Sequence, residues 1–249
     1  MKKVIFIAFA FIVAFSFTSC KSRNGQEPGK ETNIEKSGVA VCIWDNLPLR
    51  EAPASDGKWL ASVSLGEKCK YLREEKDVVS GEKTVKYVKV ELQDGKEGWV
   101  QADLVVVNGK PAVIAQDAVI YSRPDLLTKT NKSFSKMDII GIKGEQADFV
   151  EVSGKRRDGK WIETGWIKSA NLSYSDIDIA VAKYALKALA NTDKAKRNEA
   201  VNEIINNPDL KGSLFIEDLK AMVMPADEAA DAIEQEVLKA AGADSVPAQ

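Results

Sequence analysis

Apolar and polar residues alternate along much of the region 38–174, and Gly and Asp-Gly turn signals break the alternation into short runs. The alternation is clearest where Val88, Val90 and Leu92 are separated by charged residues. A period of two residues is typical of strands that bury one face, and such turn signals separate neighbouring strands. Residues 38–107 are therefore predicted to form a small, strongly bent sheet or barrel.

The chain then repeats this pattern. The stretch GWVQADL, Gly98–Leu104, returns as GWIKSANL at Gly165–Leu172, and the earlier pieces LREAP and KYVKV correspond to IYSRP and DFVEV. The pieces keep their order, and their offset drifts as loop insertions and deletions would cause. A second small barrel is therefore predicted over residues 112–174.

After Tyr174 the period of the apolar residues changes from that of a strand to that of a helix. Four successive segments carry an apolar stripe, at Ile177, Val181, Tyr184 and Ala188; at Ala200, Val201, Ile204 and Ile205; at Phe215, Leu219 and Met222; and at Ala230, Ile233 and Val237. Amphipathic helices with short links need a shared core. Residues 175–242 are therefore predicted to form a helical hairpin array or small bundle, and residues 243–249 a disordered tail.

The ends of these helices carry their own signals. Ser175 or Asp176 is placed to cap the first helix, and the charges of Asp176 and Asp178 are interpreted as favourable at a helix start. The second helix is predicted from about Thr192 to Asn206, ahead of Pro208. The fourth begins with Pro225 in its first turn.

The first residues of the chain have the layout of a secretory signal. Lys2 and Lys3 precede an uncharged run from Val4 to Phe17. The run up to Ser19 is about sixteen residues, below the ~17 to 25 of a spanning helix, and no stop-transfer pattern follows. Residues 1–19 are therefore predicted to be a cleaved signal peptide, with an uncleaved membrane anchor as the alternative.

The sequence FTSC that ends this segment resembles the lipobox of bacterial lipoproteins. It departs from the family pattern at Phe17, where Leu is usual, and at Ser19, where Gly or Ala is usual. The resemblance implies that Cys20 carries lipid and anchors the chain in a membrane of the bacterial cell envelope, facing the periplasm or the cell surface. The polar residues 20–37 then form a flexible tether.

Composition and charge exclude several classes of protein function. Removal of residues 1–19 takes Lys2 and Lys3 away, which leaves 33 basic residues of the original 35 against 37 acidic ones, so no basic field exists for nucleic acid. The chain has no histidine, which excludes Cys-His and Ser-His-Asp nucleophiles and His-ligated zinc. No glycine-rich phosphate loop is present. We therefore expect no catalysis, no cofactor and no metal site.

Two cysteines remain once Cys20 is assigned to lipid. Cys42 and Cys69 are either a disulfide in an oxidising compartment or two small buried hydrophobic residues in neighbouring strands. Sequence alone does not give the geometry that a disulfide requires.

The order of pieces in residues 38–174 resembles the bacterial SH3 domain. In the first copy the matching residues are Leu47, Leu49, Arg50 and Pro53; Leu65 and Gly66; Tyr87 and Val88; and Gly98, Trp99 and Val100. The second copy departs from the pattern: Tyr121 replaces Arg50, Ser133–Lys136 lacks the hairpin glycine, and its last loop carries the extra RRDGKW. The resemblance implies a multi-domain chain of two small all-β SH3-like barrels, followed by the helices.

The candidate ligand contacts are aromatic residues of the first copy: Trp44, Trp59, Tyr71 and Trp99. Trp44 and Trp59 lie beside Asp and Gly, where a core role is less expected, and the alternative to ligand contact is that they cover the end of the barrel. Trp99 and Trp166 are as readily core residues as groove residues.

The leading hypothesis for the function is a non-catalytic, lipid-anchored envelope module that binds a peptide or a peptidoglycan stem peptide, chiefly through the first copy. The alternative is a scaffold whose helical part docks a protein partner.

Overall fold

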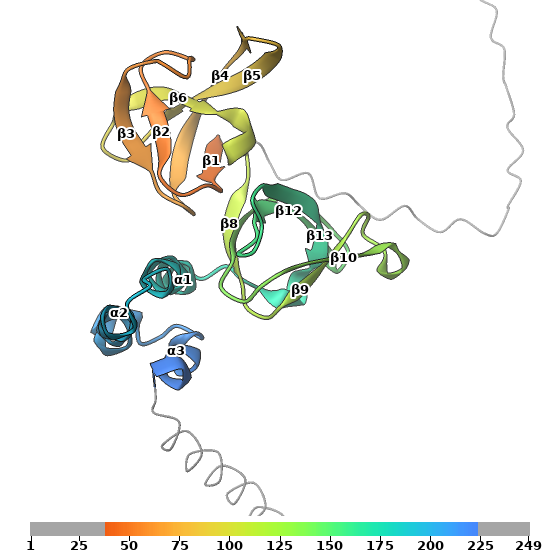
Figure 1. Cartoon of the computed structure of the whole chain (residues 1–249). Coiled ribbons are helices and arrows are strands. Elements are labelled where there is room, and N and C mark those ends of the chain that lie inside the picture. The colour runs from red at the N-terminus through yellow and green to blue at the C-terminus, as the bar shows by residue number, and fades with distance from the viewer. Residues whose placement is uncertain (1–37, 224–249) are drawn as a thin grey trace, which may run out of the picture.

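The computed structural model describes residues 38–223, which form two curled antiparallel sheets followed by three helices (Figure 1). Within this range no helix has the length and apolar character needed to cross a membrane. The predicted signal peptide, Cys20, the tether, the fourth helix and the tail lie outside the described residues.

Residues 39–107 contain the first sheet. Its strands are β1 Val39–Cys42, β2 Leu47–Arg50, β3 Trp59–Val63, β4 Lys68–Ser80, β5 Lys83–Glu91, β6 Glu97–Gln101 and β7 Val105–Val107, in the order β3-β2-β6-β5-β4-β1-β7. A one-turn 3-10 helix, η1 (Ala102–Leu104), joins β6 to β7. The alternating Val88 and Val90 point into the core of this sheet, as the pattern predicts.

The second sheet repeats the first strand for strand. Its strands are β8 Lys110–Ile114, β9 Ala118–Tyr121, β10 Lys129–Phe134, β11 Ile139–Gln146, β12 Phe149–Lys155, β13 Ile162–Lys168 and β14 Leu172–Ser173, in the order β10-β9-β13-β12-β11-β8-β14. The 3-10 turn η2 (Leu126–Thr128) precedes β10, and η3 (Ser169–Asn171) precedes β14. Both copies of the repeated Gly-Trp phrase therefore occupy the same strand of the same topology.

Three helices follow: α1 Asp176–Leu189, α2 Lys194–Asn206 and α3 Ile216–Val223, with the 3-10 turn η4 (Pro208–Leu210) before α3. The Asp193 carboxylate caps α2 by accepting hydrogen bonds from the Ala195 and Lys196 N–H groups. Ser175 occupies the N-cap position of α1 without a side-chain cap hydrogen bond.

The predicted apolar face of α1 is partly wrong. Val181 and Ala188 are buried, but Ile177 is 40% and Tyr184 is 52% exposed. The helix instead buries Ile179, Ala182 and Ala185 against the second sheet and the other helices. The small side chains of Ala182 and Ala185 let the backbone of α1 approach its neighbours closely. In α3, Phe215 just before the helix and Leu219 are fully buried as predicted, whereas Met222 is exposed.

Asp178 lies in the first turn of α1, as its interpretation as a helix-start charge predicts, and it is also buried. Its carboxylate accepts hydrogen bonds from the Ser173 hydroxyl at 2.5 Å and from the Leu214 N–H at 2.9 Å. A buried carboxylate is stable when its oxygens are hydrogen-bonded in this way. Asp178 therefore ties α1 both to the end of the second sheet and to the segment before α3.

The sheets and helices pack on one another. Val41, Ile43 and Val106, on the outer side of the first sheet, form an apolar cluster to which Ile162 of β13 adds. Val113, Met137 and Ile139 of the second sheet belong to the helical core. Two ion pairs add to these contacts, Lys68–Asp176 at 3.1 Å and Lys136–Asp218 at 2.6 Å.

Candidate functional site

A row of side chains crosses the outer face of the first sheet. Strand register places Trp59 of β3 opposite Arg50 of β2, Arg50 opposite Trp99 of β6, and Trp99 opposite Lys89 of β5. Directly opposed residues of antiparallel strands project to the same face. Their neighbours Leu49 and Val100 belong to the core, so the row lies on the opposite, outer side.

The two tryptophans of this row differ in accessibility. Trp59 is 60% exposed, whereas Trp99 is 8% exposed although it lies outside the core of the sheet. The Lys76 Nζ lies 6.0 Å from the centroid of the Trp99 ring, at the limit of a cation–π contact. Lys89 is held beside Trp99 by ion pairs to Glu74 at 3.2 Å and to Glu97 at 3.1 Å. Trp99 therefore supports the row, and Trp59 presents its ring to solvent.

Arg50 organises the loop that joins β2 to β3. Its Nη1 donates a hydrogen bond to the Gly57 carbonyl oxygen at 2.6 Å, and the Glu51 N–H donates to the Lys58 carbonyl oxygen at 2.9 Å. A Cβ atom at Gly57 would lie 2.8 Å from the Ala52 carbonyl oxygen, so the close turn requires glycine there. Arg50 thereby holds the loop 51–58 against the outer face of the sheet.

Beside this loop is a small cavity of about 100 Å³, lined by Leu47, Pro48, Arg50, Ser55, Tyr87, Gln101 and Leu104. Pro48 and Arg50 alternate with the core residues Leu47 and Leu49, so they project outward with the row. The cavity therefore continues the row of Arg50 and Trp99, with an apolar wall and one guanidinium.

The four predicted contacts do not gather at one place. Trp59 and Trp99 share the outer row, but Trp44 is half-buried beneath Lys155 of the second sheet, whose Nζ lies 4.7 Å from its ring centroid. Tyr71 packs against the core on the opposite face and donates a hydrogen bond from its hydroxyl to Glu75 at 2.8 Å. Burial, followed by that hydrogen bond, raises the pKa of Tyr71 to about 12. A ligand role for these four residues stays a prediction.

Sequence reasoning missed several members of this face. Arg50 was part of the motif but was not assigned to binding, and Tyr87 was assigned only to a strand. Gln101 and Lys89 were not considered. The alternation itself carried a signal for two of them, because Trp99 and Gln101 are two residues apart on β6 and therefore share a face.

The second sheet fills the same face differently. Register places Tyr121 opposite Trp166, as Arg50 is opposite Trp99, and places Lys129 in the position of Trp59. The Tyr121 ring packs edge-on against Phe149, with centroids 5.3 Å apart. The Lys168 Nζ lies 4.3 Å from the Phe149 ring centroid. An aromatic contact thus replaces the guanidinium that holds the first loop.

Cys42 and Cys69 are free thiols buried in the core of the first sheet, on the adjacent strands β1 and β4. This arrangement is the buried-hydrophobe alternative, and no disulfide joins the two residues. Burial raises the pKa of both thiols to about 12, so both stay protonated. Within residues 38–223 no group of three or more His, Cys, Asp or Glu side chains is placed to hold a metal ion.

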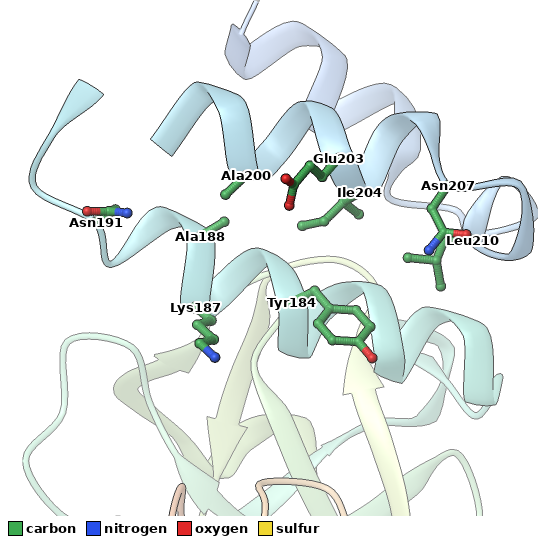
Figure 2. A pocket seen from close by; sticks show the side chains of 9 residues that line it. All are labelled: Tyr184, Lys187, Ala188, Asn191, Ala200, Glu203, Ile204, Asn207 and Leu210. Atoms are coloured by element: carbon green, nitrogen blue, oxygen red, sulfur yellow. The ribbon is translucent and has the colours of Figure 1, made fainter. Parts of the chain in front are cut away.

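A wider concavity of about 450 Å³ lies between α1 and α2. Its lining residues are Tyr184, Lys187, Ala188, Asn191, Ala200, Glu203, Ile204, Asn207 and Leu210. Figure 2 shows Ala188, Ala200 and Ile204 between the two helices, whereas Lys187 extends away from α2. Its floor is apolar, and its rim carries charges of both signs.

Residues 45–106 match the bacterial SH3 domain family. These residues include Arg50, Trp59, Trp99 and the lining of the small cavity, so the candidate site lies within a bacterial SH3 domain.

No curated protein matches the chain. Among solved structures, NlpC2 from Trichomonas vaginalis is 14% identical over 68% of this chain and 54% of that chain, with a TM-score of 0.23. NlpC1 from Trichomonas vaginalis is 12% identical over 73% of this chain and 54% of that chain, with a TM-score of 0.24. The chain thus spans about half the length of these two proteins. Similarity at this level carries neither fold nor activity to this chain.

Proposed function

We propose that this chain is a non-catalytic, cell-wall-related binding module of the bacterial envelope. Its first sheet binds a peptide or a peptidoglycan stem peptide across the outer face, and lipid on Cys20 holds the body at a membrane. The observation that carries this proposal is the row Trp59–Arg50–Trp99 beside the small cavity, inside the matched SH3 domain.

The chemistry of the row suits a short peptide that carries a carboxylate. Arg50 uses Nη1 on the Gly57 carbonyl, which leaves further N–H groups of its fork for a carboxylate. The exposed Trp59 ring offers a flat apolar surface at low entropic cost. The neighbouring cavity admits a small side chain next to Tyr87 and Pro48. An extended peptide would cross these features in order.

The second copy is proposed as a sheet of the same tandem SH3-like type with a lesser binding role. Tyr121 and Phe149 pack on each other at the position that Arg50 holds in the first sheet. An aromatic pair offers no charged partner to a carboxylate. The unequal faces therefore favour the first sheet as the binding site.

Catalysis is not part of the proposal. The chain has no histidine, and two carboxylates near the row, Glu74 and Glu97, form ion pairs with Lys89. The proposed role is therefore to hold a ligand.

The second candidate is a scaffold whose helical part docks a protein partner. The observation in its favour is the concavity between α1 and α2, where the Tyr184 side chain is half exposed above an apolar floor. A protein segment with an apolar anchor would fit such a site.

The direct test is capture of the full chain by purified peptidoglycan. Trp59→Ala should reduce the captured fraction several-fold without changing the thermal melt, because it removes exposed ring surface. Trp161→Ala is the matched control, since this tryptophan is also highly exposed but belongs to the second copy. Equal capture of wild type and Trp59→Ala, or an equal loss in both variants, would reject the outer row as the binding site.

Membrane attachment has its own test. Cys20→Ser is expected to move most of the protein out of the membrane fraction, or to leave the unprocessed precursor, because several acyl chains make a lasting anchor. Mass spectrometry of the native N-terminus should show an acylated Cys20. An intact Met1 or an unmodified Cys20 would contradict the anchor.

A further inference from the structure

The loop 122–128 joins β9 to β10 and projects from the second sheet (Figure 1). It contains two adjacent exposed leucines. Leu126 is 58% and Leu127 is 92% exposed. Exposed single leucines are common on protein surfaces, but two adjacent ones at a projecting loop form an apolar tip.

Internal hydrogen bonds fix this tip in place. The Asp125 carboxylate accepts a hydrogen bond from the Leu127 N–H at 2.9 Å, and the Thr128 hydroxyl donates to the Asp125 carbonyl oxygen at 2.7 Å. The Ser122 N–H donates to the Thr128 carbonyl oxygen at 3.0 Å. The polar groups of the loop thus form hydrogen bonds within the loop, and its apolar side chains face solvent.

The matching loop of the first sheet shows that the fold does not demand this arrangement. Residues 51–58 contain no large aliphatic side chain, and Arg50 draws them back onto the sheet through the Gly57 carbonyl. In the second sheet Tyr121 has replaced that arginine. The apolar tip is therefore a feature of the second copy alone.

Positive charge surrounds the tip. Arg123 and Lys129 flank it, both are exposed, and neither forms an ion pair with another of the residues 38–223. Lys132, further along β10, pairs with Glu163 at 2.8 Å. The single carboxylate within the loop, Asp125, accepts a hydrogen bond from the Leu127 N–H and keeps its negative charge. Two cations against one anion give the rim of the apolar tip a net positive charge.

We infer that this loop docks on a lipid bilayer that carries anionic headgroups. The two leucines enter the boundary between headgroups and acyl chains, while Arg123 and Lys129 contact lipid phosphates. A projecting tip suits a deformable surface better than it suits a protein groove, and its rim complements negative charge. This membrane contact is separate from the proposed ligand binding and does not depend on lipid at Cys20. Lipid on Cys20 would only tether the chain, whereas the loop would also fix the orientation of the two sheets on the membrane.

The test places a fluorescent probe at the tip of the full chain. Leu127→Trp is mixed with phosphatidylglycerol vesicles whose acyl chains are brominated near the headgroup, and the vesicle-bound chain is isolated by flotation. Val79→Trp is the matched control, because Val79 is also highly exposed, at 76%, but lies on β4 of the first sheet. The anchor is the same in both variants, so failure of lipidation and failure of docking are distinguishable.

The chain has five native tryptophans, so the wild-type emission is subtracted from that of each variant. We expect bromine quenching of the emission added by Leu127→Trp to be at least twice that of the emission added by Val79→Trp. Adding Arg123→Ser and Lys129→Ser, or using phosphatidylcholine vesicles, should remove at least half of that difference. Equal quenching at the two positions would overturn the inference. So would emission that is unquenched by lipid but shifts to the blue with rising protein concentration, because a second copy of the chain would then cover the loop.

Discussion

Trp99→Ala should lower the free energy of unfolding by about 3 to 5 kcal/mol, the usual cost of truncating a buried tryptophan. Trp99 is nearly inaccessible, and its ring lies between Arg50 and Lys89 on the outer face of the first sheet. Truncation leaves a void between Arg50 and Lys89, whose long, charged side chains do not replace the apolar contacts of the ring. Urea denaturation of the full chain, followed by circular dichroism, measures the change.

Trp59→Ala is the control for this measurement. It stands in the same row, but more than half of its surface is exposed, so its truncation should change the free energy of unfolding by about 0.5 kcal/mol or less. If Trp99→Ala lowers the free energy of unfolding by less than about 1 kcal/mol, the Trp99 ring does not stabilise the outer face of the first sheet.

Arg50→Ala is expected to weaken capture of a stem peptide about 10- to 150-fold, since a hydrogen bond to a charged group contributes about 1.5 to 3 kcal/mol. The substitution removes the guanidinium that lines the cavity and also releases the loop 51–58. Isothermal titration with a synthetic stem peptide gives the affinity, and a thermal melt shows whether the fold persists.

Two further variants separate charge from folding. Arg50→Lys keeps the charge but loses the planar fork, so it should restore stability more fully than affinity. Lys129→Ala removes a cation at the Trp59 position of the second sheet and should leave the affinity unchanged. An affinity for Arg50→Ala equal to that of wild type would remove Arg50 from the site.

The sequence was a good guide to local structure because local structure depends on neighbours in the chain. The alternation around Val88 and Val90 gave the strand and its buried face, and the repeated Gly-Trp phrase marked the same strand in two sheets of equal topology. The replacement of Arg50 by Tyr121 was visible as well, and register confirms that the two residues hold corresponding positions.

Contacts between distant segments could not be predicted in this way. The stripe that includes Ile177 and Tyr184 has helical spacing, but α1 packs against a sheet and two helices, so periodicity alone does not select its buried side. The carboxylate of Asp178 is buried between its two hydrogen-bond partners, Ser173 and Leu214. Leu214 is far away in sequence, so this burial could not be predicted from the residues around Asp178.

The same limit applies to the predicted site. Trp44 follows β1 near Asp45, which favoured an exposed position, but Lys155 of the second sheet lies over its ring. Gln101 joins the cavity only because β6 lies between β2 and β5, a neighbourhood that strand order determines. Pairings between strands that are distant in the chain decide which aromatic residues meet.

The most direct test of the proposed binding face is nuclear magnetic resonance of the full chain titrated with a stem peptide. We predict that the largest shifts fall on the Trp59 indole N–H, the Arg50 guanidinium and the backbone of residues 51–58, whereas the Trp166 indole and Tyr121 stay unchanged. Shifts confined to the α1–α2 concavity around Tyr184, or to the second sheet, would contradict a binding face on the first sheet.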